Sequence, residues 1–265
     1  MSADRETLLV DLGNTRLKWC ALADADGSTD GVQAIAHSGR DARAKWEACL
    51  RSRPWRSVWI ASVAPPQLLA RFEQSCAHWL PEQPRWHARS RGRCGDLRVG
   101  YDQPSQLGID RFLALLAARE LWPRERVLLA SIGSALTLDL LEADGEHAGG
   151  LIAPSPQAMH RALAGMAPQL ADVTPVMNEV PPTEFARDTA GGIASGCTFA
   201  AIGLIEHCVR AAALRGEPSM LVLTGGGAAT LAPRFEARST LVPHLVLAGL
   251  RRYAQLGSPA DGADA

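Results

Sequence analysis

The sequence predicts an α/β protein built from two related halves. Apolar strands alternate with amphipathic helices along the chain, which is typical of proteins whose sheets are covered by helices. A second observation is an internal repeat, because the strand, glycine turn and strand of residues 8–19 recur at residues 128–139. Two copies at matching places in two half-chains indicate duplicated domains that face a cleft.

The first copy of the repeat begins with an apolar strand, turns at Gly13 and small polar residues, and continues as a strand of alternating character. In the second copy Gly133 takes the place of Gly13, and Ser134 takes the place of Asn14. The other elements that the pattern predicts are strands over 57–63 and 220–223 and helices over 66–80, 108–121, 157–170 and 192–215.

The domain boundary is predicted at Trp122-Pro123, which closes the helix over 108–121. This places a first domain at residues 1–122 and a second domain at residues 123–256. Residues 257–265 are rich in Gly, Ala, Asp and Pro, and we expect them to form a flexible tail.

Composition excludes several classes of protein. The 265 residues carry 27 Lys plus Arg against 28 Asp plus Glu, and a net charge of −1 argues against a protein that coats nucleic acid. The Arg-rich segment 85–98 is interpreted as a solvated basic loop near the substrate site, with a nucleic-acid patch as the alternative. No apolar run reaches the roughly 18 residues that cross a bilayer. Six scattered cysteines without a C-x-x-C pair indicate reduced thiols, so we expect a soluble cytoplasmic enzyme.

Two glycine turns could bind phosphate. Asp11 to Thr15, with Lys18 three residues on, combines a carboxylate, a glycine and hydrogen-bonding side chains. Gly13 lacks a Cβ and lets backbone N–H groups approach a phosphate, while Asp11 could hold Mg²⁺, usually through water. Gly225-Gly226-Gly227 follows an apolar strand and would let a base or phosphate approach closely. The alternatives are a hairpin whose polar residues only satisfy the turn, and a flexible turn before a helix.

The repeated D-x-G-N/T-like turn and the late G-G-G-A resemble the actin-like ATPase and sugar-kinase superfamily. Within it, Tyr101 followed by Gly108-Ile109-Asp110-Arg111 looks like the type III pantothenate kinases, which share ancestry with the Bvg accessory factor proteins. Gly149 to Pro154 resembles the family's G-G-x-I-x-P, and Thr189 also agrees. The matches run in family order from residue 8 to about residue 230.

The resemblance implies two duplicated actin-like (ribonuclease H-like) domains with an interdomain cleft for ATP-Mg²⁺ and pantothenate. It also implies ATP-dependent phosphorylation of pantothenate to 4'-phosphopantothenate, the first step of coenzyme A biosynthesis. A homodimer is implied as well, with the second domain providing much of the interface.

Carried over by position, the resemblance makes Asp110 the catalytic proton acceptor, which fits phosphoryl transfer, where an Asp orients the attacking hydroxyl. The residues expected to hold pantothenate are Tyr101, Gly108, Ile109, Asp110, Arg111 and Thr189. The residues expected to bind ATP are Asp11, Leu12, Gly13, Asn14, Thr15, Arg16, Leu17, Lys18, Ser134, Gly225, Gly226 and Gly227. Arg111 could pair with the substrate carboxylate in bidentate fashion.

Each of these residues also has a purely structural interpretation. Asp110, at the first turn of a helix, could be a cap or a partner of the helix dipole. Arg111 could form a surface ion pair, Tyr101 could be a half-buried core aromatic, and Thr189 could be an ordinary residue at a helix N-terminus.

The second turn departs from the family pattern D-x-G-T-A-x-T-x-D. Ser131 stands where the family has the Asp that binds a monovalent cation, K⁺ or NH₄⁺, and Ser134 replaces the threonine. Asp139 matches the later Asp. The enzyme could work without a monovalent cation, another group could replace the carboxylate, or ATP binding could be impaired. The rival functions are a non-catalytic regulator of the Bvg accessory factor type and another small-molecule kinase or ATPase of the superfamily.

Overall fold

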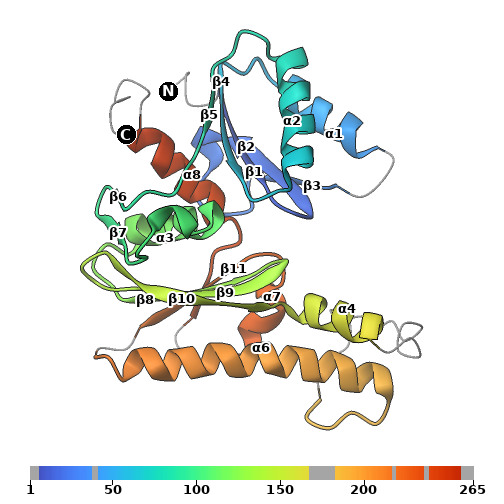
Figure 1. The fold of residues 1–265 in the computed structure, drawn as a ribbon, viewed down its shortest axis with the longest axis vertical. Coiled ribbons are helices and arrows are strands. Elements are labelled where there is room, and N and C mark those ends of the chain that lie inside the picture. Colours follow the sequence, from blue (N-terminus) through green and yellow to red (C-terminus); the bar gives the residue numbers. More distant parts are fainter. Residues whose placement is uncertain (1–5, 38–40, 167–182, 217–218, 236–238, 258–265) are drawn as a thin grey trace. The chain divides into compact units, whose positions relative to one another are not determined.

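The computed structural model describes residues 6–37, 41–166, 183–216, 219–235 and 239–257 (Figure 1). The chain forms two compact units. Unit 1 takes residues 1–124, 144–147 and 244–265, and unit 2 takes residues 125–143 and 148–243. The division after Arg124 lies near the junction predicted at residues 122–123, but the last helix of the chain belongs to unit 1. The expected tail lies outside the described residues, apart from Gly257.

Unit 1 contains a five-stranded sheet in the order β3-β2-β1-β4-β5. Its strands are β1 (Thr7–Leu12), β2 (Arg16–Ala21), β3 (Gln33–Ala36), β4 (Ser57–Ser62) and β5 (Arg85–His87), and a short pair follows, β6 (Arg93–Cys94) and β7 (Leu97–Val99). Its helices are α1 (Ala42–Arg51), α2 (Pro66–Trp79), α3 (Ile109–Leu121) and α8 (Leu245–Leu256), with 3₁₀ turns at Leu22–Asp24 and Pro104–Gln106.

Strand alternation gives the two faces of this sheet different partners. Leu8, Val10 and Leu12 of β1 pack with Trp46 of α1 and Phe72 of α2 in one buried cluster. The residues between them, including Asp11, therefore face the opposite side of the sheet, because successive side chains of a strand alternate. Helices α3 and α8 lie together on that side, away from α1 and α2 (Figure 1).

Helices α3 and α8 approach each other closely at a glycine. A Cβ on Gly249 of α8 would lie 1.8 Å from the backbone oxygen of Leu113 in α3, so the contact admits no side chain there. On the same layer Tyr253 of α8 packs edge-on against Trp59 of β4 and Phe112 of α3. This packing explains why α8 belongs to unit 1.

Unit 2 contains a sheet in the order β12-β11-β8-β9-β10. Its strands are β8 (Val127–Ile132), β9 (Ala135–Leu141), β10 (Glu146–Pro154), β11 (Met220–Thr224) and β12 (Ser239–Leu241). Its helices are α4 (Pro156–Met166), α6 (Thr189–Ala213) and α7 (Ala228–Leu231), with a 3₁₀ turn at Ala232–Arg234. The first two residues of β10, Glu146 and His147, belong to unit 1, where they pair with β7.

The core of unit 2 lies between β8 and α6. Leu128, Ala130 and Ile132 form a buried cluster with Ala201 and Ile205 of α6. Helix α6 is also the one helix in the described part of the chain that is long and apolar enough to span a membrane, and half of its apolar window is buried. A core helix of a soluble protein passes the same test of length and composition.

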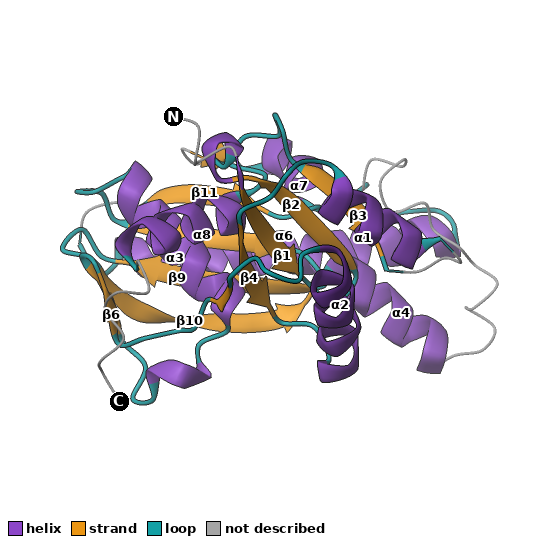
Figure 2. Cartoon of the chain, turned by 90° about the horizontal axis from the view of Figure 1, so that it is seen from above, coloured by secondary structure: helices purple, strands orange, loops and turns teal. Residues whose placement is uncertain are grey.

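The α/β class is confirmed, and the predicted helices and strands are present with small shifts at their ends (Figure 2). The helix predicted over 157–170 is described as far as Met166, and residues 167–170 lie outside the described residues.

The internal repeat is present as two hairpins that differ in turn length. In the first hairpin Leu12 pairs with Leu17 around the four residues 13–16. In the second, Ile132 pairs with Leu136 around the three residues 133–135. The sequence offset between the two copies is therefore 120 residues before the turn and 119 residues after it. Aligned by strand pairing, Thr137 is the counterpart of Lys18.

Candidate active site in two half-sites

The first half-site is built on the β1–β2 hairpin of unit 1. Asp11 and Lys18 are directly opposite each other in the antiparallel register, so their side chains project from the same face of the sheet. This is the face toward α3, whose first turn carries Asp110. A carboxylate from β1, an ammonium from β2 and a carboxylate from α3 are thus brought together within one unit.

The electrostatics of Asp11 reflect these neighbours. Burial raises the pKa of the Asp11 carboxyl group to about 6, Lys18 opposes that rise, and the negative charge of Asp110 adds to it. A carboxyl group with this pKa is half-protonated near pH 6. The position favours a positive partner, such as a metal ion, that would compensate the two acidic groups.

The turn of the first hairpin is held by a residue that the sequence did not single out. His37, just after β3, donates from Nε2 to the Gly13 carbonyl oxygen at 2.8 Å, because a carbonyl oxygen can only accept. The His37 backbone N–H also donates to the Thr15 carbonyl oxygen at 3.0 Å, and the Gly13 N–H donates to that of Arg16. These bonds fix the backbone of the turn expected to bind phosphate.

His244, immediately before α8, is a second residue that sequence reasoning missed. Its backbone N–H donates to the Gly27 carbonyl oxygen at 3.1 Å. Burial and the nearby charge of Lys18 lower the pKa of its imidazole, so the neutral ring is favoured beside the first half-site.

The start of α3 positions Asp110 and Arg111. Gly108 precedes the helix, and a Cβ there would lie 2.8 Å from Oδ1 of Asp110, so a glycine leaves room for this carboxylate. Asp110 Oδ1 accepts the backbone N–H of Arg111 at 2.9 Å, which resembles the helix-terminal role considered above. That contact engages Oδ1 and fixes the direction of the carboxylate.

Arg111 is buried, with 5% of its surface exposed, and is not the surface residue of the alternative interpretation. Its Nη1 donates to the Tyr101 hydroxyl oxygen at 2.9 Å, and its guanidinium carbon lies 5.6 Å from the Tyr101 ring centroid. Two residues expected to hold pantothenate therefore contact each other. Ile109 and Gly108 lie directly beside them at the start of α3.

The second half-site is built in unit 2 where β8 and β11 end together. Parallel pairing places Thr224 beside Ser131, so the turn after β8 and the glycines after β11 emerge at the same edge of the sheet. The Gly227 N–H donates to the Ile132 carbonyl oxygen at 3.0 Å. Ser134 is exposed in the β8–β9 turn, and its carbonyl oxygen accepts the Ser155 hydroxyl at 3.2 Å.

Gly225 is required by this packing. Its φ of +91° lies in the left-handed region, and a Cβ there would lie 2.5 Å from the Ile132 backbone oxygen. Gly226, by contrast, has nothing within 4 Å of the position of a Cβ. A ligand can therefore approach Gly226, whereas Gly225 is needed for the close packing against Ile132.

Thr189 lies elsewhere in unit 2, as the first residue of α6. Asp188 caps this helix by accepting the Gly191 N–H at 2.8 Å. Thr189 also lines an apolar hollow of about 640 Å³ between α4 and α6, together with Met159, Leu163 and Ile193. It does not lie with the β8 and β11 turns within this unit.

Ser131 has hydroxyl neighbours on both sides in the sheet, Thr137 across β9 and Thr224 across β11. Asp139, two residues beyond Thr137, faces the same side of β9 and is buried. The position that corresponds to Asp11 of the first hairpin is therefore flanked by neutral groups in its two neighbouring strands. Among the described residues, no three His, Cys, Asp or Glu side chains form a cluster that could hold a metal ion.

Residues 7–211 match the family model described as type III pantothenate kinase. This chain belongs to the type III pantothenate kinase family. A family relative from Burkholderia multivorans, described as a type III pantothenate kinase, is 38% identical over 96% of this chain and 98% of its own length. The family resemblance inferred from the motifs is thus confirmed.

Solved structures with low sequence identity share the fold of this kinase family. A Campylobacter jejuni protein assigned as a Baf family transcriptional activator has a TM-score of 0.58 and 17% identity, with 94% of this chain and 97% of that chain covered. A Sinorhizobium meliloti protein assigned as a 2-dehydro-3-deoxygalactonokinase has a TM-score of 0.53 and 15% identity, with 94% and 98% covered. These likenesses concern the fold alone.

Proposed function

We propose that this chain phosphorylates the terminal hydroxyl of pantothenate with ATP, giving 4'-phosphopantothenate and ADP. The observation that carries the proposal is the grouping of Asp11, Lys18 and Asp110 on one face of unit 1, next to the buried Arg111. The family match favours this activity over the regulator. The enzyme belongs to coenzyme A biosynthesis, and we expect it to act in the cytoplasm.

In the proposed reaction Asp110 accepts the proton of the pantothenate hydroxyl as its oxygen attacks the γ-phosphorus of ATP. A new P–O bond forms to pantothenate, the bond from the γ-phosphorus to the β–γ bridging oxygen breaks, and ADP leaves. Positioning and charge neutralisation provide most of the acceleration in phosphoryl transfer. Lys18 would neutralise phosphate charge, and Arg111 would bind the pantothenate carboxylate.

Mg²⁺ fits the first half-site. The carboxylates of Asp11 and Asp110 repel each other, and the raised pKa of Asp11 indicates that Lys18 alone does not compensate the ionised form. Oxygen ligands of this kind suit Mg²⁺, directly or through water. We propose that Asp11 holds the ion, which would neutralise phosphate charge when bound.

ATP would also contact the turns of unit 2, through Ser134 and Gly225 to Gly227. The exposed Ser134 and the open Gly226 support this assignment. Ser131, between Thr137 and Thr224, offers hydroxyl groups in place of a carboxylate, so a monovalent cation would be held weakly or not at all.

The test is ATP- and Mg²⁺-dependent formation of phosphopantothenate, measured with and without potassium. Conversion in both conditions would support the kinase and a cation-independent second half-site. Conversion only with potassium would support the kinase and mean that another group replaces the carboxylate at Ser131. A folded sample that converts no pantothenate in either condition would contradict the kinase and favour the regulator.

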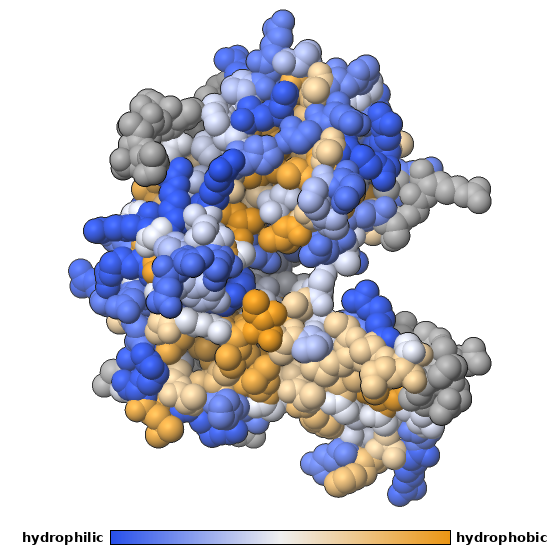
Figure 3. Space-filling model, in the orientation of Figure 1, coloured by the Kyte–Doolittle hydropathy of each residue, from blue (hydrophilic) through white to orange (hydrophobic). Residues whose placement is uncertain are grey.

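We further propose a homodimer that forms through unit 2. Apolar side chains gather on the surface of this unit around β9, β10 and α4 (Figure 3). Met166 is 81% exposed and Ile152 is 67% exposed, and the α4–α6 hollow adjoins Met166. Such an exposed apolar patch is typical of a protein–protein interface.

The oligomeric state of the chain tests this proposal. A monomeric mass for the wild-type chain in light scattering would contradict the proposal, and Leu163→Glu should dissociate the dimer.

A further inference from the structure

His147 contacts Tyr101, which is one of two neighbouring residues, with Arg111, that are expected to bind pantothenate. Its side chain is fully buried, although histidine is polar and follows the exposed Glu146. Its ring stacks on the Tyr101 ring with centroids 5.6 Å apart and planes at 27°. Offset stacking of this kind stabilises one ring orientation. Nothing in the motif pattern singles out this residue.

The segment that carries His147 is part of unit 1 and pairs with β7 there. Parallel pairing sets Glu146 beside Arg98 and His147 beside Val99, two residues before Tyr101. Gly145, with φ +90°, allows the tight approach, because a Cβ there would lie 2.3 Å from the Asp96 backbone oxygen. The strand pairing and the close approach at Gly145 thus fix the backbone position of His147 relative to β7, two residues before Tyr101.

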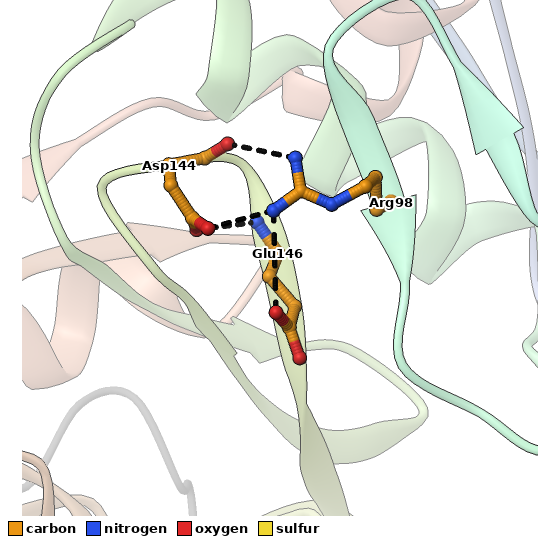
Figure 4. Close-up of polar contacts among 3 residues, drawn as sticks. All are labelled: Arg98, Asp144 and Glu146. Atoms are coloured by element: carbon orange, nitrogen blue, oxygen red, sulfur yellow. Dashed lines mark hydrogen bonds and ion pairs between the residues drawn. The ribbon is translucent and has the colours of Figure 1, made fainter.

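Arg98 binds residues 144–146, which lie next to His147, at the surface of the unit (Figure 4). Its Nη2 lies 2.7 Å from Oδ2 of Asp144 and its Nη1 donates to the Asp144 carbonyl oxygen at 3.1 Å. The Glu146 backbone N–H donates to Asp144 Oδ1, and this bond, with a smaller contribution from Arg98, lowers the pKa of Asp144. The ion pair is exposed, so its role is to fix direction rather than to add much stability.

Tyr101 connects the stacked His147 ring to Arg111 through a hydrogen bond. The Tyr101 hydroxyl oxygen accepts from Arg111 Nη1 at 2.9 Å, and Arg111 is itself buried. A planar guanidinium binds a carboxylate well only when its donors point at the two oxygens. A stacked Tyr101 ring therefore favours one position of its hydroxyl oxygen, and this hydroxyl favours one direction of the Arg111 guanidinium.

We propose that His147 is a positioning residue for pantothenate, acting through the face of the Tyr101 ring on the direction of Arg111. This inference rests on the proposed function, because it assumes that Tyr101 and Arg111 bind pantothenate. It assigns His147 no contact with substrate and no proton transfer. The proposal concerns the aromatic face of His147, which stacks on the Tyr101 ring.

The first test compares His147→Leu with His147→Phe in the full-length protein. Removal of one aromatic partner should raise the KM for pantothenate about tenfold, while the KM for ATP stays within about twofold. His147→Phe keeps a ring to stack on Tyr101 and should stay within about threefold of wild type. Calorimetry with pantothenate alone should reproduce the same order of affinities without turnover.

A double-mutant cycle with Tyr101→Leu tests whether His147 acts through Tyr101. In the Tyr101→Leu background, His147→Leu should have almost no further effect on pantothenate affinity, because its partner ring is gone. If His147→Leu does not fold, His147→Asn takes its place in the cycle, because it lacks the ring but keeps a polar group at this buried position. Additive effects of the two substitutions would overturn the proposal.

Phe72→Leu is the matched control for lost stability. Phe72 is fully buried in the α1–α2 layer of the same unit, away from the face that carries Asp11. It should lower the melting temperature without changing the KM for pantothenate. An equal rise of both KM values in His147→Leu, or no rise in the pantothenate KM, would overturn the positioning role. Loss of the proposed function is a separate result, since wild type would then convert no pantothenate at all.

Discussion

Burial raises the pKa of Asp11 in β1, and the negative charge of Asp110 in the first turn of α3 adds to that rise. The two carboxyl groups interact electrostatically because strand alternation directs Asp11 toward the side of the sheet on which α3 lies. Their repulsion, together with burial, makes the ionised first half-site costly in the absence of a positive ligand. This cost to stability is what the proposed Mg²⁺ ion would relieve.

Asp11→Asn should stabilise the ligand-free protein above pH 6. The folded pKa of about 6 exceeds the ordinary value of 3.8, so the folded state keeps a proton that the unfolded state loses between those pH values. The free energy of unfolding of wild type should thus fall between pH 4 and pH 6, by on the order of 2–3 kcal/mol. An uncharged amide at this position would avoid that cost.

Melting curves at pH 4 and pH 8 check this prediction. The variant should melt several degrees higher than wild type at pH 8, roughly 5 °C, and at nearly the same temperature at pH 4. Its Mg²⁺-ATP affinity should fall at the same time. A constant difference across the pH range would mean that the gain does not come from the Asp11 charge.

Asp110→Asn should lower kcat by roughly 10²–10⁴ if Asp110 accepts the proton of the hydroxyl. The fold should survive, because an amide oxygen can still accept the Arg111 backbone N–H that Asp110 Oδ1 now accepts. Turnover under saturating substrates and circular dichroism of the same sample measure both effects. Turnover within a fewfold of wild type would leave Asp110 only its role at the helix terminus.

Lys18→Ala should weaken nucleotide binding about tenfold and pantothenate binding much less, since Lys18 is opposite Asp11 in the hairpin proposed to bind phosphate. Lys45→Ala is the matched control, because Lys45 is the other lysine of the chain and is exposed on α1. Calorimetric titrations with ADP and with pantothenate separate the two affinities. Equal loss of both would instead indicate that Lys18 supports the hairpin.

Local sequence signals predicted the hairpins and α3 well, because each depends on residues close in the chain. Gly13 and Gly133 mark turns between apolar runs, and the helical stripe after Gly108 continues to Leu121. The one-residue difference between the two turns escaped the sequence, since glycine and small polar residues fit turns of either length.

The residue types of the candidate site could be named from the sequence, whereas their arrangement in space could not. The resemblance assigned roles to Asp11, Asp110 and Arg111, but their grouping depends on long-range packing, in which α3 contacts α8 and β4, and α8 contacts β1. His37 and His147 carry no local signal, because each acts through a contact made far along the chain. Helix α8 joins unit 1 through the contact of its glycine with the α3 backbone, a close approach that no local pattern indicates.

Two adjacent glycines of the late turn should respond in opposite ways to alanine. Gly225→Ala should lower the free energy of unfolding by about 2 kcal/mol or more, because its φ of +91° is strained for a side chain and the Cβ would meet the Ile132 oxygen at 2.5 Å. Gly226→Ala should leave stability nearly unchanged, since its Cβ meets nothing. If Gly226 contacts ATP, however, the added methyl group should raise the KM for ATP. Denaturant unfolding and ATP kinetics on both variants separate the two roles, and equal instability of the pair would show that Gly226 also serves the fold.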